Sequence, residues 1–246
     1  MGIVKNGSKS TKKTTAASKP KDTPKQKKQE EKKKSDTLQL PDVNKPAEVK
    51  KQGTGSKKNE VPTAFKQTEF ASSYEARLKQ TPAVSNPKVE FQGTRGESKC
   101  ILKPPPDPSL KRILDGADID GINYKNAVPD FSPVTKAQLE IDYMFGGTGK
   151  HGSPARRLNF VQADQKLADQ LNKSPELANQ FGMNSGKITK TQIEKYRLAN
   201  DLTWHELNDV KTIQLVPSEI NSTFGHLGGE GEINAGAFKP SSFANK

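Results

Sequence analysis

The sequence has little cysteine, few apolar residues and no long apolar run. Only 30% of its 246 residues are hydrophobic, and Cys100 is its one cysteine. A lone cysteine excludes an internal disulfide and a cysteine-ligated zinc site. No apolar run approaches the roughly 18 residues of a membrane helix, so the sequence predicts no membrane segment. Residues 1–30 contain no apolar core of a secretory signal peptide. Asn6 stands where the myristoylation pattern requires Ser or Thr.

Arginine is also missing from residues 1–60, where lysine is frequent. That segment has 17 Lys against 7 Asp or Glu, which places +10 of the chain's net charge of +12 there. Such a segment cannot bury enough apolar surface to offset its chain entropy. We therefore predict a disordered, Lys-rich tail and linker over residues 1–85 and a folded domain over residues 86–246. The tail serves either as a spacer or as a basic arm that raises the affinity for any polyanion.

From residue 86 onward, short strands and helices alternate with turn residues. The expected elements are strands on both sides of a turn at Gly93 and Gly96, a helix at 108–114, strands near 122–124 and 137–145, and helices at 156–171, 175–181 and 191–200. Asp107 and Ser174 are expected to cap the helices at 108–114 and 175–181. Leu158 and Val161 belong to the expected apolar face of the helix at 156–171. Thr191 and Glu194 have the spacing of a capping box for the last helix. Nothing in these helices suggests chemistry. We expect them to form the supporting wall of an α+β domain.

The glycine-rich stretch from Gly146 to Lys150 is not a phosphate-binding loop. The pattern G-x-x-x-x-G-K-[ST] fails because His151 follows the lysine and the glycines are misplaced. We expect a mobile loop instead. Lys150, Arg156 and Arg157 are weak candidates for contact with a phosphate backbone, and a solvated basic face is the alternative reading of these three residues.

Residues 201–229 predict a β-hairpin followed by a short helix. The first strand begins at Leu202, an Asn-Asp pair at 208–209 forms a two-residue turn, and the second strand covers residues 211–216. Pro217 then starts the helix at its favoured first position. A hairpin alone is marginally stable, so the helix is expected to pack across it.

This packing brings Asn221 and His226 near His205. Alternation along the first strand puts His205 and Glu206 on opposite faces. Five residues separate Asn221 from His226, which is about 140° around an ideal helix. Both can face one centre only if the helix ends near Gly225, as the glycines there favour. Otherwise Asn221 orients the hairpin without touching a metal.

Two histidines and an amide in this layout suit a one-metal nuclease. Hydrolysis of a phosphodiester requires a base to deprotonate water and a cation to neutralise the developing charge. An imidazole supplies either role, and an amide oxygen ligates or orients. The alternative is that His205 is a satisfied strand histidine and His226 a helix C-cap that the helix dipole favours.

Several blocks of this region, in order, resemble the toxin nucleases of the HNH/endonuclease VII superfamily, in the branch marked by a WHH or WHE strand. The blocks are Trp204-His205-Glu206, Gln214 to Pro217, Ile220-Asn221-Ser222 and Phe224 to Gly229. Residues 93–98 and 129–133 are similar to segments found ahead of the core in these toxin modules. The resemblance covers roughly residues 90–235 and is most specific at 203–229.

The resemblance implies a ββα-metal (HNH-like) core and a divalent metal ion, which is Mg²⁺, Mn²⁺ or Zn²⁺. Carried over by position, His205 is the strand histidine, Asn221 the central residue and His226 the helix histidine. The chain departs from the WHH pattern at Glu206 and Asn221. Either His205 is the base and the metal rests on His226 and other groups, or His205 ligates and Glu206 or another acid assists. We prefer His205 as base, His226 as ligand and Asn221 as an orienting or ligating residue.

Arg95, near Glu97, is a weaker candidate for holding the scissile phosphate. A salt bridge that fixes a loop is the competing role.

The predicted function is a metal-dependent endonuclease toxin that hydrolyses phosphodiester bonds in DNA, with RNA as the less favoured substrate. By resemblance, the producing cell carries a cognate immunity protein that is acidic where it covers the cleft. We expect the toxin to be made in the bacterial cytoplasm and delivered to the target-cell cytoplasm by a route without a cleavable signal peptide. The competing class is a non-catalytic nucleic-acid-binding or structural protein with a basic arm.

Overall fold

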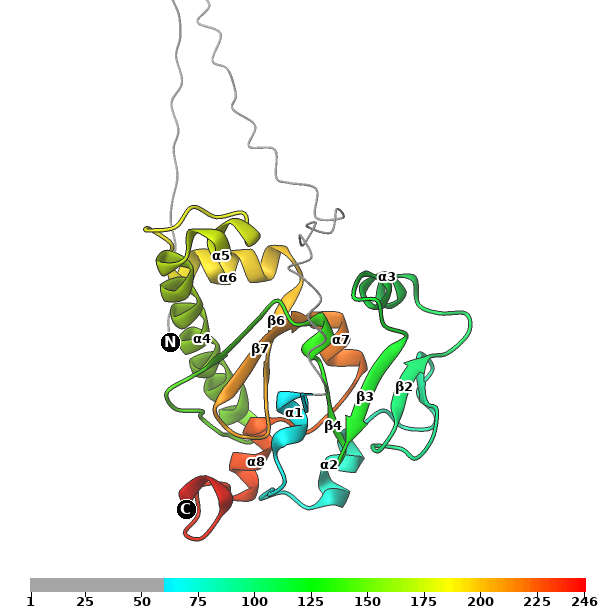
Figure 1. Ribbon diagram of the computed structural model, residues 1–246. Helices are drawn as coiled ribbons and strands as arrows, with labels where there is room; N and C mark the ends of the chain where they lie inside the picture. The colour runs from blue at the N-terminus through cyan, green and yellow to red at the C-terminus, as the bar shows by residue number, and fades with distance from the viewer. Residues whose placement is uncertain (1–59) are drawn as a thin grey trace, which may run out of the picture. The chain divides into compact units, whose positions relative to one another are not determined.

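The computed structural model describes residues 60–246 (Figure 1). The first 59 residues of the predicted tail lie outside this range. The described helices are α1 (Thr63–Lys66), α2 (Tyr74–Gln80), α3 (Pro108–Gly116), α4 (Gly152–Lys173), α5 (Pro175–Gln180), α6 (Lys190–Ala199), α7 (Ser218–Thr223) and α8 (Gly229–Ala235). Short 3-10 turns occur at η1 (Ser132–Val134), η2 (Gly149–His151) and η3 (Phe243–Asn245).

Two antiparallel sheets accompany these helices. The strands are β1 (Val89–Phe91), β2 (Lys99–Leu102), β3 (Gly121–Lys125), β4 (Val128–Pro129), β5 (Ala137–Glu140), β6 (Leu202–Glu206) and β7 (Thr212–Pro217). The first sheet has the order β1-β2-β3-β4 and the second the order β5-β7-β6. In the register of β6 and β7, Trp204 is paired with Leu215 and His205 with Gln214. This mixture of helix and strand confirms the predicted α+β class.

Helix α7 lies between the two sheets (Figure 1). Its Ile220, and Phe224 just after it, join the apolar core of the first sheet, together with Val216 at the end of β7. Trp204, Ile213 and Leu215 belong to the other core, which α4, α5 and α6 cover. The hairpin and α7 therefore stand where two cores meet, and packing from both sides fixes their relative positions.

Helix α4 buries polar residues where an apolar face is expected. Leu158 and Val161, two apolar residues of the predicted face, are 47% and 40% exposed, whereas Asn159 and Asp164 are buried. The reason lies in strand β6. The indole N–H of Trp204 donates to Asp164 at 2.8 Å, and the Arg197 guanidinium lies 3.4 Å from the same carboxylate. The helix supports the strand through buried hydrogen bonds as well as through apolar contact.

The hairpin turn is longer than the predicted two-residue turn. Residues 207–211 separate the strands, and Val210 has a positive φ of 57°. The Asp209 carboxylate accepts the backbone N–H groups of Lys211 and Thr212, at 3.1 and 2.8 Å. The prediction was wrong because this aspartate closes a local turn with its own side chain, which widens the connection.

The capping signals are correct for two helices and displaced for a third. Asp107 caps α3 and Ser174 caps α5, as predicted. Helix α6 has its capping box at Thr189 and Gln192 instead of Thr191 and Glu194. Both pairs have the same i, i+3 spacing, so local sequence does not distinguish them.

Residues 60–85 differ from the predicted linker. They form α1 and α2, and they bury the Ser72 and Arg77 side chains. The Arg77 guanidinium stacks 3.8 Å above the centre of the Phe70 ring and donates to the Asn126 carbonyl at 2.9 Å. A polar composition hides this order, because the segment is stabilised by contacts with residues distant in the sequence.

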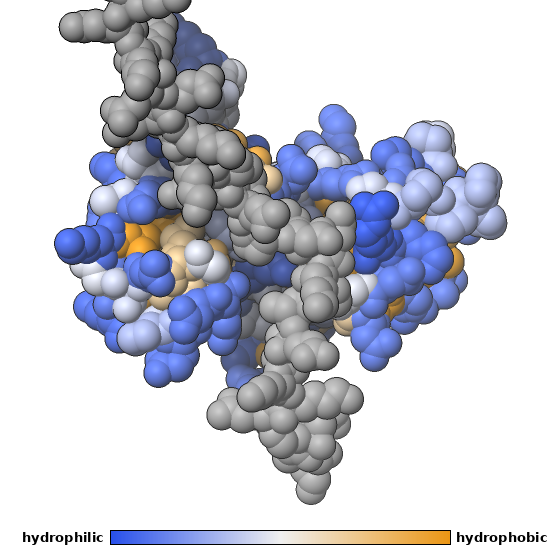
Figure 2. All heavy atoms as spheres, turned by 90° about the horizontal axis from the view of Figure 1, so that it is seen from above, coloured by the Kyte–Doolittle hydropathy of each residue, from blue (hydrophilic) through white to orange (hydrophobic). Residues whose placement is uncertain are grey.

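Hydrophilic side chains cover most of the face shown in Figure 2, where a hydrophobic patch lies on the side of α4, α5 and α6. Leu198 of α6 is 63% exposed. The described part of the chain contains no helix with both the length and the hydropathy of a membrane span.

Replacing Asp164 with Ala should lower the free energy of unfolding by about 3 kcal/mol, because the Trp204 indole and the Arg197 guanidinium lose their buried acceptor. Urea unfolding followed by Trp204 fluorescence measures this change. Asp169→Ala, on the exposed face of the same helix, is the matched control and should change the free energy by less than about 0.5 kcal/mol. Equal losses in both variants would contradict the support assigned to Asp164.

Candidate functional site

The site forms because α7 ends early. The helix stops at Thr223, and Phe224 has non-helical dihedral angles of −90° and 70°. The condition set by the spacing of Asn221 and His226 is therefore met. Gly225 and Gly228 allow the loop that follows α7, residues 224–228 (the histidine loop), to lie close to other backbone. A Cβ at Gly225 would stand 2.6 Å from the Gln80 carbonyl, and one at Gly228 would stand 2.7 Å from the Glu206 carbonyl.

The loop places the ring of His226 against the ring of His205. The two ring centres are 4.5 Å apart and the planes meet at 82°. Phe131 packs edge-on against both rings, at 4.8 and 5.5 Å. Phe131 lies in the segment 129–133 that resembles the upstream part of toxin modules. Its role is to form an apolar wall for the two imidazoles.

His205 is buried and polar atoms around it lack partners. It is 1% exposed, and neither of its ring nitrogens has a hydrogen-bond partner among the described residues. The buried Oδ1 of Asn221 is also without a partner within residues 60–246. Burial, together with the charges of His226 and Arg156, holds the pKa of His205 well below its usual range. The nearby Asn221 side chain raises the pKa of His205 in part, although the geometry between the two side chains falls short of a hydrogen bond.

His226 has one nitrogen engaged and one available. Its Nδ1 lies 3.2 Å from the Phe224 carbonyl, which can only accept, so Nδ1 carries the proton and Nε2 keeps its lone pair. Burial lowers the pKa of His226 from 6.5 to about 4, against the opposing effect of that hydrogen bond. A backbone-oriented neutral imidazole with a free Nε2 is the arrangement that metal-binding histidines commonly adopt.

Glu206 and His205 point to opposite faces of β6, as expected. Glu206, like Trp204, bonds to helix α4, whereas His205 packs against Phe131 and His226. Both residues nevertheless line one cavity, at the point where β6 ends. The Asn159 amide donates to the Glu206 carboxylate at 2.9 Å. Burial raises the pKa of Glu206 from 4.5 to about 6, and Asn159 and Arg156 limit the increase. The carboxyl group can therefore exchange a proton near neutral pH.

A cavity of about 640 Å³ contains the candidate residues. Its polar lining comes from β6, α7, the histidine loop, α8 and the start of α4. The polar lining residues include Arg156, His205, Glu206, Asn221, His226 and Glu230. A cation from α4 and carboxylates from β6 and α8 thus face the two imidazoles. Such a cavity can hold a phosphate together with a neutralising cation.

The other predicted phosphate contacts fall into two groups. Arg156 lines the cavity, whereas the exposed Lys150 and Arg157 are not among its lining residues. Arg95 is occupied elsewhere. Its guanidinium donates to the carbonyls of Leu78, Pro82 and Thr81, at 2.9, 2.8 and 2.8 Å. These contacts oppose the predicted phosphate role of Arg95 and give it a loop-fixing role through backbone carbonyls.

Sequence reasoning missed Asn159 and Glu230. Helix α4 was expected to take no part in chemistry, yet Asn159 holds Glu206 and Arg156 enters the cavity. The signal that was available is a pair of polar residues, Asn159 and Asp164, on the buried side of an amphipathic helix. Buried polar residues need specific partners, so such positions identify contacts that an apolar pattern does not.

The donor set suits a divalent ion only in part. Within the described range, no three side chains of His, Cys, Asp and Glu lie close enough together to hold a metal. The unpartnered atoms of His205 and Asn221, and the free Nε2 of His226, nevertheless supply two nitrogens and an oxygen around one cavity. These residues fit a metal whose remaining ligands are water or substrate oxygens.

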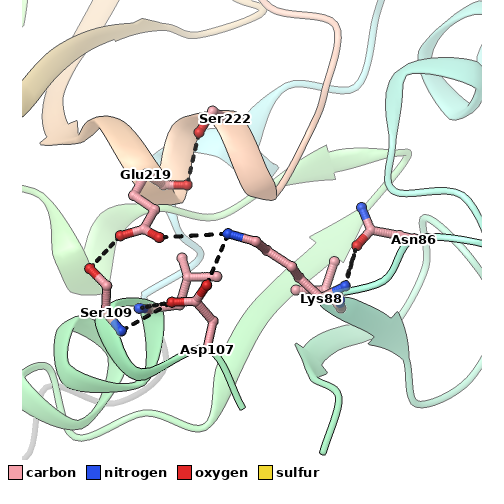
Figure 3. Close-up of polar contacts among 8 residues, drawn as sticks. Asn86, Lys88, Asp107, Ser109, Glu219 and Ser222 are labelled. Carbon is pink, nitrogen blue, oxygen red and sulfur yellow. Dashed lines mark hydrogen bonds and ion pairs between the residues drawn. The ribbon is translucent and has the colours of Figure 1, made fainter. Parts of the chain in front are cut away.

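Helix α7 is also tied to α3 from its outer side. Figure 3 shows Glu219 between Ser109 and Lys88. The Ser109 hydroxyl donates to the Glu219 carboxylate, while the Lys88 ammonium lies 3.9 Å from Glu219 and 2.9 Å from Asp107. This contact fixes the first turn of the helix that carries Asn221.

Comparison with known families relates this site to nuclease toxins. Residues 121–228 match the family model described as the DNase/tRNase domain of colicin-like bacteriocin. The matched range contains His205, Asn221 and His226, and it supports a nuclease toxin that acts on nucleic acid. No curated protein and no solved structure matches the chain.

Lowering the pH should destabilise the metal-free protein through His226. Between pH 6.5 and about 4, the unfolded chain binds a proton at this residue and the folded protein does not. The free energy of unfolding therefore decreases as the pH is lowered through this range, by about 3 kcal/mol in total for this group. Glu206 acts in the opposite direction between pH 4.5 and about 6, because burial raises its pKa in the folded state.

Comparison of the wild type with His226→Gln, by urea unfolding in the presence of a chelator, isolates the contribution of His226. The variant should lose the part of this destabilisation that His226 contributes and keep the part that comes from His205, whose pKa is also lowered. His151→Gln, at an exposed position, is the control and should keep both parts. Identical pH profiles for the wild type and His226→Gln would show that the imidazole is not buried in its neutral form.

Proposed function

We propose that the chain is a metal-dependent endonuclease of the HNH type, which hydrolyses phosphodiester bonds in DNA, with RNA as the less favoured substrate. The observation that carries the proposal is the pair of facing imidazoles with available nitrogens, inside a cavity and within the range similar to bacteriocin nuclease domains. The HNH assignment rests on the hairpin, the short helix and the histidine loop, together with the resemblance of the WHE blocks.

His226 Nε2 and Asn221 Oδ1 would hold the divalent ion, which is Mg²⁺, Mn²⁺ or Zn²⁺. Bound there, the ion supplies positive charge that stabilises the developing charge on the phosphate and the leaving oxygen. Phe131 excludes water from one side of the two rings, which strengthens electrostatic interactions in the site. The Phe224 carbonyl keeps His226 in the tautomer that leaves Nε2 free.

His205 is the proposed general base. Its low pKa keeps the imidazole neutral at pH 7, so that a ring nitrogen can accept a proton from the attacking water. A phosphate in the cavity brings negative charge, which raises the pKa of His205 and makes it a stronger base. Glu206, with a pKa of about 6, is the alternative base, in which case His205 becomes a metal ligand.

A second candidate function is a non-catalytic nucleic-acid-binding protein. One observation favours it: residues 60–246 contain no three-residue His, Cys, Asp or Glu cluster of the kind that holds a metal. Both functions use the cavity and its arginine, but only the nuclease depends on the imidazoles for bond cleavage.

Plasmid cleavage with Mg²⁺, Mn²⁺ or Zn²⁺ tests the proposed function. His205→Ala should reduce the cleavage rate by about 10²-fold to 10⁴-fold, because a general base contributes that much. His226→Ala should abolish metal-dependent cleavage. His151→Ala is the matched control, since His151 is exposed and does not line the cavity, and should cleave like the wild type.

No cleavage by the wild type with any of these metals would favour the binding protein. Full activity of both His205→Ala and His226→Ala would remove them from the mechanism. Activity retained in His205→Ala but lost in Glu206→Gln would make Glu206 the base. In bacteria, expression of the wild type should stop growth, the inactive variants should not, and co-expression of the proposed immunity protein should restore growth. The proposed site of action is the target-cell cytoplasm, after delivery from the producing cell.

Arg156 should hold the substrate phosphate, and its neighbour Arg157 should not. Arg156→Ala should lower kcat/KM for plasmid cleavage by about 10-fold or more, because a charged hydrogen bond to phosphate contributes roughly 1.5–3 kcal/mol. Arg157→Ala removes the same charge from the same turn of α4, outside the cavity. Equal losses of kcat/KM in the two variants would mean that Arg156 acts only through general charge attraction.

A further inference from the structure

Glu232 of α8 is a fully buried carboxylate that accepts four hydrogen bonds. It is 0% exposed and lies outside the range that matches the bacteriocin nuclease domain. Its Oε2 accepts the backbone N–H groups of Ala71 and Ser72, at 2.8 and 3.0 Å. Its Oε1 accepts the Ser72 hydroxyl at 2.5 Å and the Asn208 amide at 2.9 Å. A buried charge with this many donors is held in one place.

Asn208 connects this carboxylate to the loop that carries His226. The same Asn208 Nδ2 that donates to Glu232 also donates to the carbonyl of Leu227, at 2.9 Å. Leu227 directly follows His226, so the two hydrogens of one amide group join the carboxylate to the histidine loop. Asn208 itself follows β6 in the hairpin turn, two residues after Glu206.

The segment before residue 86 closes the network from the other side. Arg77 of α2 is buried and donates to the Ser72 carbonyl at 2.7 Å and to the Ser72 hydroxyl at 3.1 Å. The end of α2 also touches the histidine loop, since the Gln80 carbonyl occupies the space that a side chain at Gly225 would need. Residues 71–80 thus contact the loop at both of its ends, directly at Gly225 and through Glu232 and Asn208 at Leu227.

We propose that Glu232 is a positioning residue for the nuclease site and that residues 71–80 form an integral part of that site. Glu232 binds Ser72 on one side and Asn208 on the other, and this connection holds the Leu227 carbonyl. With Leu227 fixed, the Nδ1–H group of His226 stays directed at the Phe224 carbonyl, which leaves Nε2 of this cavity-lining residue free. The consequence for catalysis rests on the proposed function, whereas the consequence for the His226 tautomer does not.

Two adjacent serines provide a matched test in the full chain. Ser72→Ala removes the hydroxyl that donates to Glu232. Ser73→Ala removes a hydroxyl that caps α2, where it accepts the Ala76 N–H and bonds to the Glu75 side chain, without reaching Glu232. Glu232→Gln is the stronger variant, because an amide group presents donors where the carboxylate accepts. The first measurement is ¹⁵N–¹H correlation of the histidine rings in metal-free protein, which has only three histidines to assign.

In the wild type and in Ser73→Ala, His226 should occupy the single tautomer protonated at Nδ1. Ser72→Ala and Glu232→Gln should show a mixture of tautomers. In plasmid cleavage with Mg²⁺, the same two variants should lose about 10-fold to 100-fold in kcat, the range for residues that orient a metal ligand, with KM unchanged. If Glu232→Gln does not fold, Ser72→Ala supplies the test.

A single Nδ1–H tautomer of His226 in folded Ser72→Ala and Glu232→Gln would overturn the proposal. So would a loss of kcat in Ser73→Ala equal to that in Ser72→Ala, which would indicate a general effect of the segment's stability. If the wild type does not cleave nucleic acid, the proposed function fails, while the tautomer measurement still decides the role of Glu232.

Discussion

The contact between the rings of His205 and His226 requires the chain to leave helix α7 after Thr223. A continued helix would carry His226 about 140° away from Asn221 around its axis. The chain turns toward β6 at Phe224, which has non-helical dihedral angles. The histidine loop then lies close to the backbone of β6 and α2. The edge-on rings then form one wall of the cavity. The other polar side chains of the cavity surround the two imidazoles only because the chain leaves the helix at this point.

Two neutral imidazoles in such a place are stable only in a rigid frame. An unpartnered buried polar group costs about 1–3 kcal/mol, and His205 and Asn221 contribute three such atoms. Three hydrogen bonds hold the elements around them: Asp164 holds Trp204, Asn159 holds Glu206, and Glu232 holds the loop through Asn208. Buried polar groups without a partner in a cavity are typical of functional sites, where a ligand supplies the missing partner.

Local rules predict much of this architecture from sequence. Strand alternation, the capping residues Asp107 and Ser174, and the spacing of Asn221 and His226 identify the hairpin, several helices and the early helix end. The rest depends on contacts between distant segments. The buried Asn159 and Asp164 of α4, the order of residues 71–80 and the shared cavity of His205 and Glu206 all need partners far away in the chain. No local pattern encodes such partners. The prediction of a two-residue hairpin turn was wrong for the opposite reason, because a local contact of the Asp209 side chain lengthens the turn.

Crystals of the protein soaked with Zn²⁺ and measured at the zinc absorption edge would show whether His226 binds a metal ion in the cavity. We expect an anomalous peak in the cavity about 2.0–2.1 Å from Nε2 of His226, the usual zinc–nitrogen distance. Asn221 should be among the neighbouring ligands and the Nδ1–H bond to the Phe224 carbonyl should be intact. An anomalous peak only at the exposed His151, or a metal in the cavity that is not bound to Nε2 of His226, would show that His226 is not the metal ligand.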